Sequence, residues 1–194
     1  MSNRLVSLLD RLVVAVTNQG SSMRDALLPG LGEDAIRSRL SPLGLEPPPE
    51  LIALFGWHNG CHTSSGLDSW FGPAMTLLSL EKAEEAHELV QEFLPVRVEV
   101  GEIEHALWFP VVDRHEAGVV VMDCHGASPS FGSVFGYDFQ LDLPAYRPPT
   151  LAEPMERWVG YVERDVWRRG ADGWWIDYRE SVTREANDAR GNLP

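Results

Sequence analysis

Five residues with reactive or metal-binding side chains lie in two short segments of the chain, and these are His58, Cys61, His62, Cys124 and His125. A His-x-x-x-His pair within one helix can bind zinc, because residues four positions apart share a helical face. Here Asn59-Gly60 lies between the two histidines and is expected to end the helix. No glutamate follows His58 as the base of a zinc protease would. The pattern therefore favours His58 as a helix-end residue over a metal ligand.

A cysteine nucleophile needs a neighbouring histidine base and donors that stabilise an oxyanion. Cys61 with His62 or His125 would supply the first pair, but no nucleophile-elbow or oxyanion-hole signature accompanies it. The phosphate-binding patterns GxGxxG and GxxxxGK[ST] are also missing from the sequence. We therefore expect no catalytic residue, no metal and no cofactor. A metal- or thiol-dependent enzyme is kept as the less favoured alternative.

The chain of 194 residues carries 29 acidic and 16 basic side chains, for a formal net charge of −13. Phosphate recognition needs a surface rich in lysine and arginine, so nucleic acid is not expected as the main partner. Asp10 and Arg11 interrupt the apolar N-terminal run, so neither a membrane span nor a signal peptide is expected. Cys61 and Cys124 indicate free thiols in a reducing compartment, with a single bridge left open. We expect a cytoplasmic protein with a protein partner.

The segment from Leu43 to Gly60, LGLEPPPELIALFGWHNG, predicts one short helix with defined ends. Proline is favoured at the first helical position, so the helix should begin at Pro49. Asn59-Gly60 should end it, because glycine readily takes the left-handed conformation that follows a helix. The apolar residues recur at the spacing of one buried helical face, which comprises Leu51, Ile52, Leu54, Phe55 and His58.

Helical spacing of apolar residues predicts further helices over residues 3–17, 33–43, about 80–94 and about 150–169. Ser79 is the expected N-cap of the third of these helices. For the last helix, Thr150 with Glu153 offers a capping box, although Pro154 would place its start later. Gly170 should end this helix, which would be the longest in the chain.

β-branched and aromatic runs predict strands over residues 75–78, 106–112, 118–123, 132–141 and 173–178. The polar residues 113–117 should turn the second strand into the third, as a hairpin. Pro95 should end the preceding helix, with residues 96–100 extended, and residues 61–72 should form a loop. Helices, a short strand and a strand meander in this order predict an α+β fold with an antiparallel or mixed sheet and flanking helices.

The expected organisation has three parts. Residues 1–32 form an N-terminal helical extension, residues 33–178 form the α+β domain, and residues 179–194 form a polar tail without periodicity. Trp174 and Trp175 are adjacent in a predicted strand, so their side chains should point to opposite faces. One of them should pack inward, and the other should be exposed or covered by another chain.

Charge is concentrated between Glu81 and Glu104, where eight acidic residues accompany two basic ones. A helix face this acidic is suited to docking a basic protein. A solvated helix face with no binding role is the alternative explanation. The residues of the predicted docking surface are Glu81, Glu84, Glu85, Glu88 and Glu92.

The order of these motifs resembles the SUKH superfamily, which includes fungal regulators of cell-wall assembly and killer-toxin resistance and many bacterial immunity proteins. The similar segments, within about residues 33–169, are Leu43–Leu45, Pro49–Leu51, Phe55–Gly60, Leu77–Leu80, Leu107–Val111 and Gly118–Asp123, followed by Val134 and Trp158. Pro48 stands where the family usually has leucine. The signature residues are Pro49, Leu51, Phe55, Trp57, Asn59, Gly60, Trp108 and Pro110.

The resemblance implies a SUKH-like α+β domain that binds proteins and is not an enzyme. Bacterial members neutralise a cognate toxin domain, often a nuclease, whereas fungal members act as signalling scaffolds. The leading hypothesis is therefore an immunity protein, with a regulatory scaffold of the same fold as the alternative. A toxin nuclease usually has a basic surface, which an acidic protein could block electrostatically.

Overall fold

The computed structural model describes residues 2–62, 70–99, 107–115, 118–137, 147–170 and 173–177. The elements run in the order α1 (Ser2–Asn18), α2 (Met23–Ala26), β1 (Leu27–Pro29), α3 (Glu33–Leu40), η1 (Ser41–Leu43), α4 (Pro49–Trp57), β2 (His58–Cys61), β3 (Trp70–Gly72), β4 (Met75–Leu77), α5 (Leu80–Glu99), β5 (Trp108–Asp113), β6 (Val119–Asp123), β7 (Val134–Tyr137), α6 (Ala152–Glu163), β8 (Trp167–Gly170) and β9 (Gly173–Ile176). The fold is α+β, as predicted.

The central sheet is a five-stranded antiparallel meander in the order β3-β4-β5-β6-β7. The predicted hairpin is formed by β5 and β6, with Phe109 opposite Met122. The register shifts near Pro110, because proline has no N–H for the ladder and is tolerated at a bulge. Two smaller antiparallel sheets, β1-β2 and β8-β9, complete the described strands.

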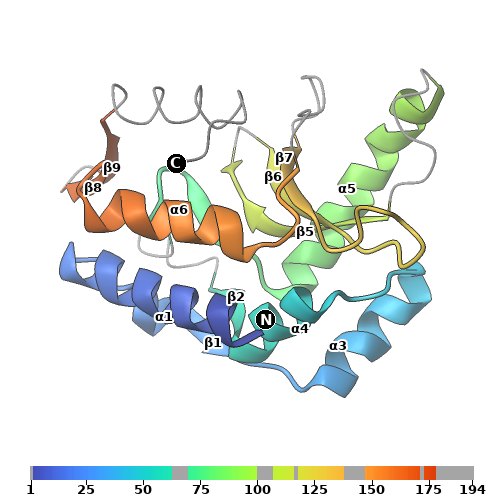
Figure 1. The fold of residues 1–194 in the computed structure, drawn as a ribbon, viewed down its shortest axis with the longest axis horizontal. Coiled ribbons are helices and arrows are strands. Elements are labelled where there is room, and N and C mark those ends of the chain that lie inside the picture. Colours follow the sequence, from blue (N-terminus) through green and yellow to red (C-terminus); the bar gives the residue numbers. More distant parts are fainter. Residues whose placement is uncertain are drawn as a thin grey trace.

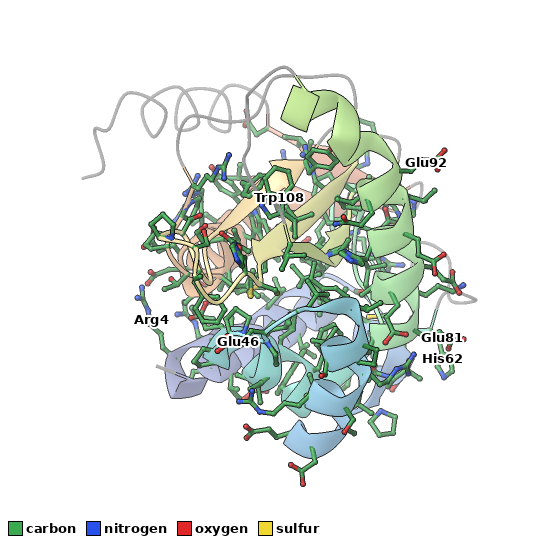
Figure 2. The ribbon with its side chains drawn as sticks, turned by 90° about the vertical axis from the view of Figure 1, so that its right-hand side faces the viewer. Arg4, Glu46, His62, Glu81, Glu92 and Trp108 are labelled. Carbon is green, nitrogen blue, oxygen red and sulfur yellow. The ribbon has the colours of Figure 1, made fainter. Side chains whose placement is uncertain are left out.

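The two faces of the central sheet contact different partners, as alternation along each strand requires. One face joins the main hydrophobic core with α1, α4 and α6, through Phe109, Val111, Val120, Met122 and Val134. The other face forms a second cluster with Val90 of α5, through Trp108, Val119, Val121, Phe135 and Tyr137. Figure 2 shows α5 running alongside the sheet strands that carry Trp108.

α1 and α6 lie side by side in the structure (Figure 1). Arg4 pairs with Glu156 at 2.5 Å, and Arg11 pairs with Glu163 at 2.9 Å. The two pairs are seven residues apart on both helices, so the helices run parallel. The apolar face of α1 lies in the main core (Leu5, Leu9, Leu12 and Val16). The predicted extension of residues 1–32 thus shares its hydrophobic core with the rest of the chain.

The sequence placed several element ends wrongly. α4 ends at Trp57, and His58 begins β2, so His58 is not on the buried helical face. Trp70 and Phe71 form strand β3, which pairs with β4, although a loop was predicted there. α5 continues to Glu99, past Pro95. Proline removes one helical hydrogen bond but keeps a helical φ, so the helix can pass through it.

The last helix is also shorter than predicted, and α5 is longer than it. α6 ends at Glu163 because Asp165 takes the left-handed conformation with φ 57°. The N–H of Val166 then bonds the carbonyl of Tyr161, a closure usually made with glycine. Trp167 consequently belongs to strand β8, and the predicted end at Gly170 was wrong.

Some predictions fall outside the described residues. These comprise most of the predicted loop after His62, the end of the strand predicted over residues 132–141, and the tail at 179–194. Within the described residues, no helix has the length and apolar character to cross a membrane.

Candidate protein-binding surface

Two polar side chains of the segment Pro49–Cys61, named here the capping segment, bind the N-termini of other helices. Glu50 lies in the first turn of α4 and is 8% exposed. Its Oε2 accepts hydrogen bonds from the backbone N–H groups of Leu151 and Ala152, at the start of α6. The predicted capping box at Thr150 is therefore wrong, because α6 has Leu151 as its N-cap and receives its cap from a distant helix.

Burial raises the pKa of Glu50 above its ordinary value, although the two backbone N–H groups and Arg4 act in the opposite direction. A carboxylate at a helix N-terminus gains from the helix dipole, but it loses solvation when it is buried. In this case desolvation is the larger effect.

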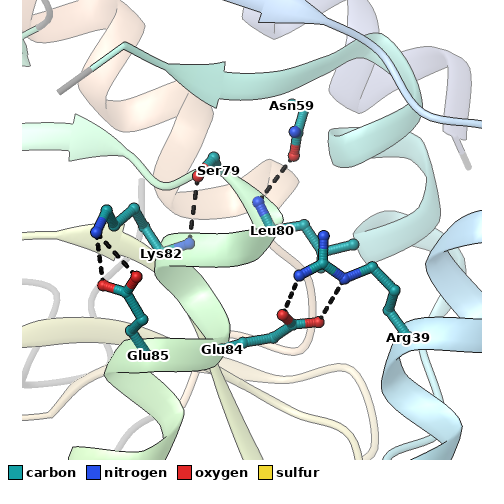
Figure 3. A network of polar contacts seen from close by, with 7 residues as sticks. All are labelled: Arg39, Asn59, Ser79, Leu80, Lys82, Glu84 and Glu85. Carbon is teal, nitrogen blue, oxygen red and sulfur yellow. Dashed lines mark hydrogen bonds and ion pairs between the residues drawn. The ribbon is translucent and has the colours of Figure 1, made fainter.

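Asn59 links the capping segment to the start of α5 (Figure 3). The Oδ1 of Asn59 accepts a hydrogen bond of 2.8 Å from the N–H of Leu80, and Ser79 caps Lys82 at 3.2 Å. Gly60 has φ 68°, and a Cβ added there would collide with the backbone of Leu78 and Ser79. Gly60 thus takes the left-handed conformation, as predicted. It does so within strand β2, where its backbone lies close to the backbone of Leu78 and Ser79.

The other signature residues lie mostly in the core. Leu51, Phe55, Trp108 and Pro110 are buried. Trp57 is half-buried, and its Nε1 donates a hydrogen bond of 2.8 Å to Asp10 of α1. Packing and capping therefore account for these residues.

The N-terminal part of α5 turns a charged face outward. Glu84 binds Arg39 of α3 through two hydrogen bonds, and Lys82 binds Glu85 at 2.6 Å, as Figure 3 shows. The hydrogen bond to Glu85 raises the pKa of Lys82. Glu84 is consequently a link between two helices, and it is less available to a partner than the sequence suggested.

The remaining predicted glutamates form what we call the acidic ridge: Glu81, Glu85, Glu88 and Glu92, all exposed. Figure 2 shows Glu81 and Glu92 on the outer side of α5. Among the described residues, no ion pair involves Glu81, Glu88 or Glu92. These three carboxylates are therefore the ones that a basic surface could bind without breaking a described ion pair.

Leu89 was not among the residues of the predicted docking surface, and it is 53% exposed. It follows Glu85 by four residues and precedes Glu92 by three, so its side chain adjoins the acidic ridge. Leu89 lies off the buried side of α5, which Ala83, His87 and Val90 mark. Protein interfaces commonly place an apolar contact inside a polar rim, and Leu89 beside the ridge fits that arrangement.

The opposite face of α5 is held by a buried histidine. His87 is buried, and its Nδ1 lies 2.9 Å from the carbonyl oxygen of Trp108, to which it donates. Burial lowers the pKa of His87 below its ordinary value. The hydrogen bond to Trp108 and the charge of Glu88 act in the opposite direction but are the smaller effects. This contact fixes how α5 presents the acidic ridge.

The candidate thiols are in apolar surroundings. Cys61 and Cys124 are both buried and unbridged. Burial raises the pKa of Cys61 to about 12, and burial together with the charge of Asp123 raises the pKa of Cys124. A buried thiol of this kind stays protonated at neutral pH, which makes it a poor nucleophile.

The candidate histidines have local roles. His58 Nδ1 lies 2.8 Å from the carbonyl oxygen of Leu28, and the backbone N–H of His125 donates to Asp123. Across the described parts of the chain, no three His, Cys, Asp or Glu side chains gather as metal ligands would.

No protein-family model and no curated protein matches this chain. The resemblance to the SUKH superfamily accordingly stays a prediction that rests on the order of the sequence motifs.

Proposed function

We infer that this chain is a non-enzymatic protein-binding domain of the SUKH type, an immunity protein that binds and neutralises a basic toxin domain. The observation that carries the proposal is the acidic ridge, with Leu89 exposed beside it. Glu81, Glu88 and Glu92 keep their charge available on the outer side of α5, and the chain as a whole carries −13. Complementary charge speeds encounter with a basic partner and suppresses wrong ones.

The contacts beneath the ridge support a binding role. α5 is anchored by Asn59 at its first turn, by Arg39 at Glu84 and by Trp108 at His87. A helix held at three points presents its outer face with little freedom left to lose on binding, and such preorganisation favours affinity. The buried, protonated thiols favour binding over thiol catalysis.

The test is coexpression of the chain with toxin domains encoded beside its gene, measured as survival of the host cell. Protection together with direct binding of the purified toxin domain is the expected result. Toxicity that persists in every such pairing, with no binding in vitro, would reject the proposal.

A charge-reversal variant then tests the surface. Glu88→Lys with Glu92→Lys should slow association by about tenfold or more and flatten its dependence on salt, because long-range attraction sets the association rate. The matched control is Asp25→Lys with Asp34→Lys, an equal charge change at exposed positions on α2 and α3. If both variants slow association equally, net charge alone is responsible and the ridge is not the docking surface.

A further inference from the structure

The hairpin β8-β9 lies at the end of the molecule opposite α5 (Figure 1). Arg168 pairs with Trp175 across the hairpin, and Arg169 pairs with Trp174. Trp167, Trp174 and Ile176 pack toward the main core. Trp175 points away from it and is 62% exposed, the highest value among the described large hydrophobic side chains. An exposed tryptophan on a short hairpin suggests a contact surface.

The outer edge of β8 is closed by a side chain. Gln19 accepts a hydrogen bond of 2.8 Å from the N–H of Arg169 and donates one of 3.1 Å to the carbonyl of Trp167. Its amide therefore takes the place of a neighbouring strand. Because residues alternate in direction along a strand, Arg168 and Gly170 must point their backbone groups toward β9.

The outer edge of β9 differs. Trp175 and Gly173 use their backbone groups to bind β8, so the N–H and C=O groups of Trp174 and Ile176 point outward. In the described part of the chain, no hydrogen bond reaches these four groups. An open strand edge of this kind is a template for pairing with another strand.

The open edge is complementary to itself. We propose that β9 pairs antiparallel with β9 of a second copy, about a two-fold axis at Trp175. Trp174 then lies opposite Ile176 of the second copy, and Ile176 opposite its Trp174. Each of these pairs exchanges two hydrogen bonds, so all four outward groups are satisfied in an isologous contact. The result is one four-stranded sheet across the dimer.

The side chains suit the same register. Trp175 lies opposite Trp175 of the second copy as a non-hydrogen-bonded pair, in which side chains approach most closely. Arg168 stands next to Trp175 on the same face, where a guanidinium can lie over an indole. The acidic ridges remain free at the far ends of the dimer, so this contact is independent of the proposed toxin binding (Figure 1).

Sedimentation of the purified full chain over a range of concentrations tests the dimer. The average mass should rise from 21.7 kDa toward twice that value. Added salt should strengthen association, because two chains of charge −13 repel each other when unscreened. A chain that keeps the mass of one copy at every concentration and salt level overturns the proposal and leaves the edge to a different partner.

Trp175→Lys should weaken dimerisation at least about tenfold, because it brings two like charges together at the axis of the strand pair. Leu89→Lys is the matched control, since Leu89 is similarly exposed on the distant α5 and its variant should dimerise like the wild type. A Trp175→Lys chain that dimerises as tightly as the control overturns the proposed interface.

A cross-link tests the register directly. Trp175→Cys places two thiols at a non-hydrogen-bonded pair with a Cα separation of about 4.5 Å, within the range that a disulfide spans. Mild oxidation should yield a disulfide dimer much faster for Trp175→Cys than for Leu89→Cys. The native cysteines are buried and should not compete. Equal rates for the two variants contradict the two-fold pairing.

Discussion

The capping segment and the acidic ridge both carry polar side chains, but in opposite environments. Glu50 is buried and Asn59 half-buried, and each accepts hydrogen bonds from the N-terminus of a helix distant in sequence. Glu81, Glu88 and Glu92 are exposed and form no described ion pair. A polar group without water must be satisfied inside the fold, whereas an exposed one can exchange water for a partner. The first region should therefore govern stability and the second should govern binding.

The largest effect is expected at Gly60. Gly60→Ala should lower the free energy of unfolding by about 3 kcal/mol or more. The cost of the left-handed φ and the cost of the collision with the backbone of Leu78 and Ser79 add together. Gly44→Ala has a similar φ of 73° with open space around it, and should cost only about 1 kcal/mol. Urea unfolding measures both variants. Equal losses would show that the close approach contributes nothing.

The second largest loss of stability is expected when the Glu50 cap is removed. Glu50→Ala leaves the first N–H groups of α6 unsatisfied in a buried place, for a loss of about 2 kcal/mol. Glu50→Gln keeps an oxygen acceptor and should recover most of this loss. Thermal unfolding compares the two variants, and a glutamine variant as unstable as the alanine variant would argue against the capping role.

Asn59→Ala should cost about 1 kcal/mol, because Leu80 loses its side-chain acceptor while Ser79 still caps Lys82. The companion variant Ser79→Ala removes the other cap. If the two caps act on separate N–H groups, the double variant should lose the sum of the single losses. A double variant no worse than either single one would mean that one cap replaces the other.

The pH dependence at Glu50 is expected to be smaller. Its pKa is raised by burial, so the folded chain binds this proton more tightly than the unfolded chain. The stabilisation is complete below the unfolded pKa and is lost as pH rises through the folded pKa. The stability of the wild type relative to Glu50→Gln should therefore fall from below pH 4.5 toward neutral. Unfolding at a series of pH values checks the sign, and a rise would refute it.

The smallest effect on stability is expected at the acidic ridge. Changing Glu81, Glu88 and Glu92 together to glutamine should alter the free energy of unfolding by less than about 0.5 kcal/mol, because these side chains make no described ion pair. Association with the proposed toxin partner should slow in the same variant. A large loss of stability would mean that the ridge is structural and would remove the contrast with the capping segment.

Local signals sufficed for much of the fold. Pro49 begins α4 because its φ is preset for a first helical turn, and Ser79 caps α5 through its own side chain. The run of valines before Asp123 predicted β6, and the adjacent Trp174 and Trp175 predicted one inward and one exposed ring. In each case neighbours along the chain supply the interaction, so the sequence alone was informative.

Contacts between distant residues decided the rest. Nothing near Thr150 indicates that Glu50 caps α6, and nothing near Gln19 indicates that it closes the edge of β8. The acidic face of the proposed binding surface follows from helical spacing in the sequence. The pairing of Glu84 with Arg39 could not be predicted, because it depends on the packing of α3 beside α5. The sequence by itself determined which side chains are charged and which elements carry them. Only the tertiary structure decided which of those charges are already satisfied, because satisfaction depends on what lies within hydrogen-bonding distance.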